Sequence, residues 1–426
     1  VLKKVKNIEE YKKHFTESPQ KLLNSLNEII KIEEKISRIY SYAHMKYDQD
    51  TQDEKYQNYK NKAMMTYNKF SNSTSFMVPA IIKLGEEKLA SFIEKEEGLE
   101  FYQHFFDNIM RQKEHYLSEE EEKILALAGE VTQSSETIFS MLNNADLEFP
   151  LIKDENNEEV RLTHGRYIDF LKNEDRRVRK DAFEGMHGEY ENLENTFAAV
   201  LDSSVKGDIF YAKARKYESS LEASLDDDNI SLDVYNNLID TVSENLKPLH
   251  DYMALKKELL SLEELHIYDT YTPLIKDVDL KFDYEETKEI IKNAAAPLGE
   301  DYVAKVEQGF NSGWIDVYEN KGKRSGAYSS GCYGVHPYIL MNYTKDISNL
   351  FTLVHEMGHA MHSYYSNKHQ PYLYADYKIF VAEVASTLNE NLLVDYMLNN
   401  AESREEKLYL LNYFLEGFRG TVYRQT

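Results

Sequence analysis

Residues 346–365 read DISNLFTLVHEMGHAMHSYY, and this stretch decides how the rest of the sequence is interpreted. It predicts a helix, because its apolar residues recur at spacings of three and four positions. Asp346 or Ser348 at its start can accept a backbone hydrogen bond and cap that helix. The apolar stripe consists of Leu350, Val354, Met357, Met361 and Tyr364.

Two histidines in this stretch have the spacing of metal ligands. His355 and His359 are four positions apart, so their imidazoles project from one helix face about one turn apart. That spacing lets both rings reach a single ion at the short distances that zinc requires. Glu356 lies roughly 100° around the helix, where it can deprotonate a water without displacing it. The alternative is that both histidines are core residues whose hydrogen bonds are made within the protein. Burying them would cost desolvation free energy, and the sequence shows no evident partner that would compensate that cost.

The third ligand must come from elsewhere, because a catalytic zinc site usually has three protein ligands and a water. A metzincin would place a histidine where this chain has Tyr365, so that subclass is excluded. Glu383 lies among apolar and small residues at the start of a predicted helix, and a carboxylate buried there needs a cation. His362 would overshoot the ion, so we expect it to support a ligand or make a buried hydrogen bond. Glu390 can orient a ligand imidazole, although an ordinary solvated glutamate is equally consistent.

Helical periodicity covers most of the chain, so we expect a mainly α-helical fold with a small β-element near the active site. Residues 147–167 predict a β-hairpin around an acidic turn at 153–159, and the apolar run 338–343 predicts a strand. The further helices are expected at residues 19–45, 51–70, 85–110, 175–201 and 232–262.

A domain boundary is expected near Ser118, because a serine followed by four glutamates is a strong helix start. The expected division is an N-terminal helical domain, residues 1–117, and a catalytic domain, residues 118–426.

The amino-acid composition argues against some classes of binding partner. The 426 residues include 42% hydrophobic residues and carry a formal net charge of −24, which disfavours nucleic acid and anionic membranes. The basic stretch at residues 176–180 lies among acids and is interpreted as a solvated helix face. Cys332, the single cysteine, cannot form an internal disulfide and agrees with a reducing compartment. We therefore expect a cytoplasmic protein without a membrane span.

Several longer blocks resemble one known family. HEMGH at 355–359 and FVAEVAST at 380–387 resemble oligoendopeptidase F, within the thimet oligopeptidase-like family of zinc metallopeptidases. The resemblance covers nearly all of the chain. It includes FSMLNNADLEFP at 139–150, ENKGKRSGAYSSG at 319–331 and SYYSNKHQPYLYADY at 363–377.

The resemblance implies a site and an activity. Its zinc ligands would be His355, His359 and Glu383, holding one Zn²⁺ per chain, and its general base would be Glu356. The implied fold is a mainly α-helical, two-lobed zincin-type peptidase with a deep channel. That channel would admit short unstructured peptides and exclude folded proteins, so the expected activity is endopeptidase hydrolysis of oligopeptides.

The small β-element is expected within residues 327–343, where a peptide could add to a strand edge through backbone hydrogen bonds. We expect Gly326, Ala327, Tyr328 and Tyr338 to contact substrate. The glycines of this region permit close backbone approach, although ordinary turn glycines are an equally good interpretation.

The end of the chain departs from the family pattern. Related proteins continue past the equivalent of Arg424-Gln425-Thr426 into helices that carry hydrogen-bond donors to the oxyanion. Losing one such donor typically lowers the rate by about 10²–10³. The sequence therefore suggests a truncated catalytic domain, which a separate C-terminal fragment could complete. The alternative function is a zinc-binding, peptide-binding scaffold with weak or no catalysis.

Overall fold

The computed structural model describes residues 1–275 and 280–426, apart from the side chains of residues 119, 123 and 130. The fold is mainly α-helical, as predicted, with two small sheets in the described residues. Contacts divide the chain into two compact units, Val1–Lys113 with Asp279–Glu402 and Glu114–Val278 with Ser403–Thr426. No helix in the described ranges is long and apolar enough to cross a membrane.

This division differs from the expected one at residues 1–117 and 118–426. The sequence boundary lies close to Lys113, but residues 279–402 pack with the N-terminal segment and residues 403–426 pack with the middle of the chain. Local sequence patterns could not predict this division into units, because both units join segments that are far apart in the sequence.

The N-terminal part of the first unit is a helical bundle with its own core. Every buried residue of this core lies between Val5 and Ile109, and partly buried Leu373 packs against it. One expected helix, residues 85–110, is wrong: the extended backbone of Glu96 ends α6, and a 3-10 turn precedes α7. The elements are α1 (Leu2–Lys6), α2 (Ile8–Lys12), α3 (Pro19–Gln49), α4 (Glu54–Thr74), α5 (Met77–Leu84), α6 (Glu86–Lys95), η1 (Glu97–Tyr102) and α7 (Gln103–Arg111).

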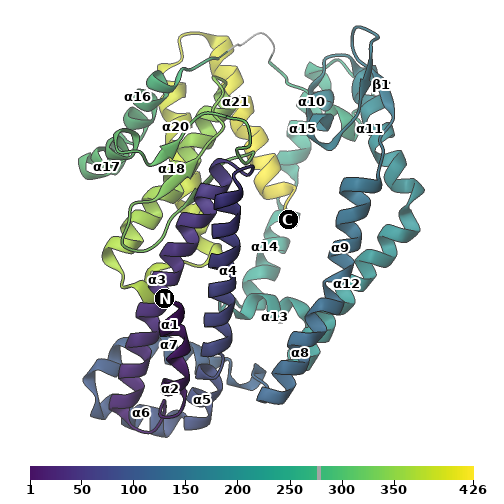
Figure 1. Cartoon of the computed structure of the whole chain (residues 1–426). Helices are drawn as coiled ribbons and strands as arrows, with labels where there is room; N and C mark the ends of the chain where they lie inside the picture. The colour runs from purple at the N-terminus through teal and green to yellow at the C-terminus, as the bar shows by residue number, and fades with distance from the viewer. Residues whose placement is uncertain (276–279) are drawn as a thin grey trace. The chain divides into compact units, whose positions relative to one another are not determined.

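The remainder of the first unit carries the residues of interest. Helices α18 and α20 pack side by side (Figure 1). Helix α18 also packs against strands β4 and β5. The elements are α16 (Tyr284–Ala294), η5 (Ala296–Leu298), α17 (Glu300–Asn311), β3 (Ile315–Asp316), β4 (Tyr328–Ser330), β5 (Tyr338–Leu340), α18 (Ile347–His369), α19 (Tyr372–Ala375) and α20 (Ile379–Asn400).

Strand β5 is the central strand of the three-stranded sheet, whose order is β3-β5-β4. It pairs in parallel with β3 and antiparallel with β4, with Ser329 opposite Ile339. Strand β4 therefore has one paired side and one side that pairs with no other strand of the described chain.

The second unit confirms two local predictions. Ser118 forms a capping box with Glu121 at the start of α8, and β1 and β2 form the expected antiparallel hairpin. The elements are η2 (Lys113–His115, at the junction), α8 (Glu119–Thr132), α9 (Ser134–Met141), η3 (Leu142–Asp146), β1 (Leu151–Lys153), β2 (Glu159–Arg161), α10 (His164–Lys172), α11 (Arg176–Asn192), α12 (Glu194–Ala214), α13 (Ser220–Asp226), α14 (Leu232–Glu244), α15 (Lys247–Leu259), η4 (Ile267–Asp269), α21 (Arg404–Phe418) and η6 (Arg419–Tyr423).

The expected single helices at 175–201 and 232–262 are each two helices, interrupted at Leu193 and before Pro248. Proline lacks the backbone N–H that would continue the preceding helix, which explains the second break. The first has no comparable residue, and the chain simply leaves helical geometry at Leu193, where φ is −112°.

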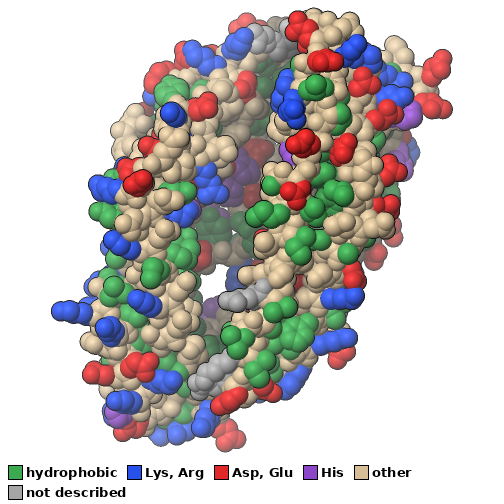
Figure 2. All heavy atoms as spheres, turned by 45° about the vertical axis from the view of Figure 1, so that its right-hand side comes forward, with side chains coloured by type: hydrophobic (Ala, Val, Ile, Leu, Met, Phe, Trp, Pro, Cys, Tyr) green, Lys and Arg blue, Asp and Glu red, His purple; other side chains and the backbone are tan. Residues whose placement is uncertain are grey.

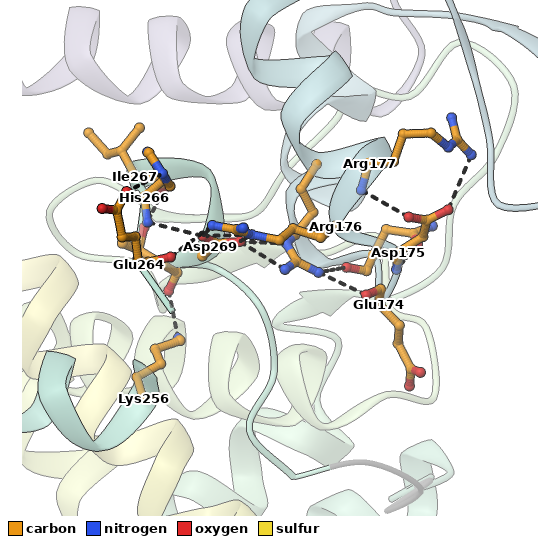
Figure 3. A network of polar contacts seen from close by, with 12 residues as sticks. Glu174, Asp175, Arg176, Arg177, Lys256, Glu264, His266, Ile267 and Asp269 are labelled. Atoms are coloured by element: carbon orange, nitrogen blue, oxygen red, sulfur yellow. Dashed lines mark hydrogen bonds and ion pairs between the residues drawn. The ribbon is translucent and has the colours of Figure 1, made fainter. Parts of the chain in front are cut away.

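The basic stretch at 176–180 is not wholly a solvated face, so that prediction is wrong in part. Arg179 is buried and donates to the fully buried carboxylate of Asp269, which also accepts from Arg176 (Figure 3). Acidic and basic side chains are otherwise interspersed on the face shown in Figure 2.

Candidate metal centre

Helix α18 supplies two of the predicted ligands. Asp346 caps its start by accepting from the backbone N–H of Asn349 at 2.9 Å, while Ser348 donates to the same carboxylate. Gly358 allows α20 to approach closely, because a Cβ at this position would lie 2.6 Å from the Cα of Ser386. The predicted helix is thus confirmed, and its glycine has a packing role.

The structure brings His355, His359 and Glu383 together. The two Nε2 atoms are 3.1 Å apart, and each lies 3.4 Å from Oε2 of Glu383. Ligand atoms that surround a tetrahedral zinc at ~2.0–2.1 Å are about 3.3 Å from one another. The three atoms therefore have the spacing of a zinc donor set, and their chemistry, two imidazoles and a carboxylate, is that of a catalytic zinc site.

One reason given for Glu383 is wrong. Its side chain is 59% exposed, so burial does not by itself demand a cation. Its proximity to the histidines comes instead from the packing of α20 on α18. Ser386, which the sequence reasoning missed, donates to Oε2 of Glu383 at 2.8 Å and holds its orientation. The sequence does contain a signal for this contact, because Ser386 lies three positions after Glu383 on one predicted helix.

Glu390 contacts the far side of the first ligand. Its Oε1 lies 2.5 Å from Nδ1 of His355, which leaves Nε2 facing His359 and Glu383. This contact raises the pKa of His355, against the effect of burial. Burial lowers the pKa of His359. Of the two interpretations of Glu390, the geometry favours the one in which it orients a ligand imidazole.

Glu356 directly follows His355 on α18, and its side chain is buried. Burial raises the pKa of Glu356, and the charge of His355 and the backbone amide of Ser329 act in the opposite direction. The hydrogen bond with the Ser329 backbone places the Glu356 carboxylate beside strand β4, against which α18 packs.

His362 does not make the expected hydrogen bond through Nδ1. That atom is buried and has no partner among the described residues, and burial lowers the pKa of the ring. The imidazole stacks on Tyr377, with ring centroids 3.7 Å apart. His362 is therefore held chiefly by ring packing.

In strand β4, the backbone N–H and C=O of one residue point toward the side that has no partner strand in the described chain. The N–H of Ile339 donates to Trp314, on the β3 side, so Ser329 opposite Ile339 belongs to a non-hydrogen-bonded pair. The N–H and C=O of Ser329 consequently point away from β5, toward the unpaired edge. Sequence analysis could not identify Ser329, because its role depends on strand register.

The four predicted substrate-binding residues lie around this strand. Gly326 has φ +82°, a conformation that favours glycine, and its carbonyl accepts from Asn342 at 2.8 Å. Ala327 immediately precedes β4. Tyr328 and Tyr338 share a sheet face and line a cavity of about 520 Å³ beside α3, apart from the metal-binding cluster. Substrate contact by these residues stays a prediction.

A mainly helical fold that presents two histidines and a glutamate from a packed helix pair is the arrangement of the His₂Glu class of proteins, whose three side chains could hold one metal ion. The sequence profile of peptidase family M3 matches residues 170–426, and that of its oligopeptidase F N-terminal region matches residues 81–149. The chain belongs to peptidase family M3.

Curated relatives and solved structures agree with this assignment. Oligopeptidase PepF of Bacillus subtilis is 50% identical over 99% of this chain, which covers 63% of that protein. Group B oligopeptidase PepB of Streptococcus agalactiae is 40% identical over 99% of this chain and 70% of its own length. The crystal structure of oligoendopeptidase F from Enterococcus faecium is 37% identical, with a TM-score of 0.71 over 99% of this chain and 70% of that one. This chain thus spans about two thirds of the length of such relatives.

Proposed function

We propose that this chain carries the zinc centre of an oligoendopeptidase, which hydrolyses internal bonds of short, unstructured peptides. The observation that carries the proposal is the 3.1–3.4 Å spacing of the three ligand atoms beside the buried carboxylate of Glu356. Membership of peptidase family M3 supports peptidase chemistry. Because the chain spans 63% of the Bacillus subtilis relative, the activity of the whole protein is part of the proposal.

In this proposal His355, His359 and Glu383 hold one Zn²⁺. The ion would supply Lewis acidity and lower the pKa of a water. Glu356 takes the proton of the attacking water and passes it to the leaving amine of the substrate. Glu390 holds the His355 ring through Nδ1, and Ser386 holds the Glu383 carboxylate, so both ligands keep their orientation through the reaction.

The open edge of β4 provides a place for an extended substrate. A peptide that pairs with the N–H and C=O of Ser329 would run past the carboxylate of Glu356, since the Ser329 amide faces that carboxylate. Backbone pairing selects extended chains with little regard to side chains, which suits short unstructured peptides as substrates. The deep channel, the absence of nucleic acid and membrane partners and the cytoplasmic location stay predictions from the sequence.

The test uses an internally quenched peptide with an acetylated N-terminus and an amidated C-terminus. An endopeptidase cleaves it, whereas an enzyme that must bind a free terminus does not. Metal analysis of the purified chain should give close to one zinc per chain. Glu356→Gln should retain that zinc and lose turnover by roughly 10³-fold or more. Full activity in Glu356→Gln would refute the general-base role, and bound zinc without any cleavage would favour the scaffold alternative.

A further inference from the structure

The last turn of α3 carries a buried acid that contacts the segment leading into β4. Asp48 is 1% exposed, and its Oδ2 lies 3.1 Å from the Tyr328 hydroxyl, 3.2 Å from Arg324 Nη1 and 3.3 Å from His44 Nε2. A buried carboxylate is unfavourable unless such donors compensate it. The contact between Asp48 and Tyr328 therefore holds both groups in place across 280 positions of sequence.

The same helix binds the chain on both sides of β4. Further hydrogen bonds join α3 and the residues that directly follow it to residues 322–333, most of them through backbone carbonyls of that segment, and the Thr51 hydroxyl donates to Gly322 O at 2.8 Å. The others run from Arg324 N to Asp48 O at 2.8 Å, Thr51 N to Gly322 O at 2.7 Å, Ser41 Oγ to Gly331 O at 3.1 Å and Arg38 Nε to Tyr333 O at 3.1 Å. The segment around β4 is thus fixed by α3 as well as by its one partner strand.

Tyr328, which contacts α3, directly precedes Ser329, whose backbone faces the unpaired edge of β4. Tyr328 forms the hydrogen-bonded pair with Leu340 and extends its side chain to Asp48. The next residue, Ser329, directs its N–H and C=O away from β5, and its amide faces the Glu356 carboxylate. Among these α3 contacts, the one with Tyr328 is made by a residue of the three-residue strand β4 itself, whereas the others flank the strand. We therefore expect a change in the Asp48–Tyr328 contact to shift the adjoining Ser329 edge.

We propose that Asp48 is a positioning residue, which sets the open edge of β4 against Glu356 through the Tyr328 hydroxyl. The proposal rests on the proposed function, because the edge matters only if an extended peptide binds there. It assigns Tyr328 a role different from the substrate contact expected from the sequence. Its side chain faces α3, and its effect on substrate passes through the neighbouring backbone.

The test combines kinetics with a double-mutant cycle. Tyr328→Phe removes only the hydroxyl, and Asp48→Ala removes the acceptor; each should raise KM for the blocked peptide by about tenfold with little change in kcat. Asp48→Asn should recover part of the loss, since its amide oxygen can still accept from Tyr328. Combining Tyr328→Phe with Asp48→Ala should add little to Asp48→Ala alone, because Asp48→Ala already removes the acceptor of the Tyr328 hydroxyl together with the contacts to Arg324 and His44.

Two variants serve as controls. Tyr42→Phe removes the hydroxyl of an exposed tyrosine on the same helix, and Asp53→Asn keeps the cap of α4; both should leave KM unchanged. Zinc content should be equal in all variants. A lower melting temperature in Tyr328→Phe with unchanged KM would overturn the proposal, and so would fully additive effects.

Hydrogen exchange separates this proposal from the proposed function. In Tyr328→Phe the amides of residues 322–333 should exchange about tenfold faster than in the unaltered chain, whether or not any peptide is cleaved. If the unaltered chain cleaves nothing, the proposed function fails on its own. Unchanged exchange in Tyr328→Phe would show that Asp48 does not position β4.

Discussion

Oε1 of Glu390 lies 2.5 Å from Nδ1 of His355, while Nε2 of the same ring faces Glu383 at 3.4 Å. The two nitrogens of one imidazole therefore have different partners, one that orients the ring and one that completes the ligand set. Partners of this kind raise the basicity of a ligand histidine and fix its tautomer.

Glu390→Ala should accordingly weaken zinc binding by about 10–100-fold. Competition with a chromophoric chelator measures the affinity directly and needs no substrate. Asp395→Ala is the matched control, because Asp395 is an exposed carboxylate on the same helix. Equal zinc affinity in Glu390→Ala and Asp395→Ala would contradict the orienting role.

Gly358→Ala should separate the two helices that carry the ligands. The new Cβ would lie 2.6 Å from the Cα of Ser386 and 2.8 Å from the carbonyl oxygen of Ala385, and backbone atoms cannot move aside as a side chain can. We expect a loss of about 1–3 kcal/mol in the free energy of unfolding together with weaker zinc binding. Thermal melting and chelator competition measure the two effects.

Gly188→Ala provides the comparison for that substitution. Gly188 is inside α11, and nothing lies within 4 Å of the position of its Cβ. Alanine there should stabilise the helix by about 0.5–1 kcal/mol. If Gly358→Ala behaves like Gly188→Ala, the close approach of α18 and α20 does not limit the site.

The buried carboxylate of Asp269 should make the second unit sensitive to acid. Burial alone would raise the pKa of Asp269, but hydrogen bonds from Arg176, Arg179 and the backbone of His266 outweigh it and hold the pKa below 3.8. A carboxyl with a lowered folded-state pKa stabilises the fold above its unfolded pKa and loses this contribution as the pH falls further. The stabilisation is therefore present above about pH 4 and is lost below it.

Asp269→Asn should lower the free energy of unfolding by about 3 kcal/mol at neutral pH, because it leaves Arg179 buried without a charged partner. The difference from the unaltered chain should shrink as the pH falls below 4. Urea unfolding at a series of pH values measures this convergence. A difference that stays constant down to pH 3 would show that folding does not lower the pKa of Asp269.

Lys256 is a second buried charge in the same unit, with only 1% of its side chain exposed. Its Nζ donates to Glu416 at 2.7 Å and to the carbonyl of Thr270 at 2.6 Å, which joins α15 to α21. Lys256→Met should cost about 1–3 kcal/mol, since Glu416 then loses one of two cationic partners and keeps Arg419, whose Nε lies 2.7 Å from its Oε2. Adding Glu416→Gln should recover much of that loss, because the amide still accepts from Tyr252. Additive losses on thermal melting would argue against a coupled pair.

The sequence predicted the features that depend on neighbouring positions. The helix at 346–365, the His355–His359 pair and the capping box at Ser118 all follow from spacings of three or four residues. The structure places Glu383 beside the two histidines, as predicted, but its exposed side chain contradicts the argument from burial. Its approach depends on how α20 packs on α18, which no local pattern contains.

Other features needed the register of strands or contacts across long separations. Ser329 faces the open edge only because β5 lies between β3 and β4. Asp48 meets a partner 280 positions away, and nothing in its own helix distinguishes it from a solvated aspartate. The composition of the two units was missed for the same reason, since residues 279–402 return to the N-terminal segment.

The contact between Asp48 and Tyr328 also sets an order of events during synthesis. All buried residues of the N-terminal core lie within the first 109 positions and can condense early, yet Asp48 must wait 280 positions for its hydroxyl partner. At roughly 5–20 residues per second, that interval lasts about a quarter of a minute to a minute. We expect the end of α3 to stay hydrated on the ribosome until β4 emerges, which proteolysis of arrested nascent chains would reveal as late protection of residues 44–53.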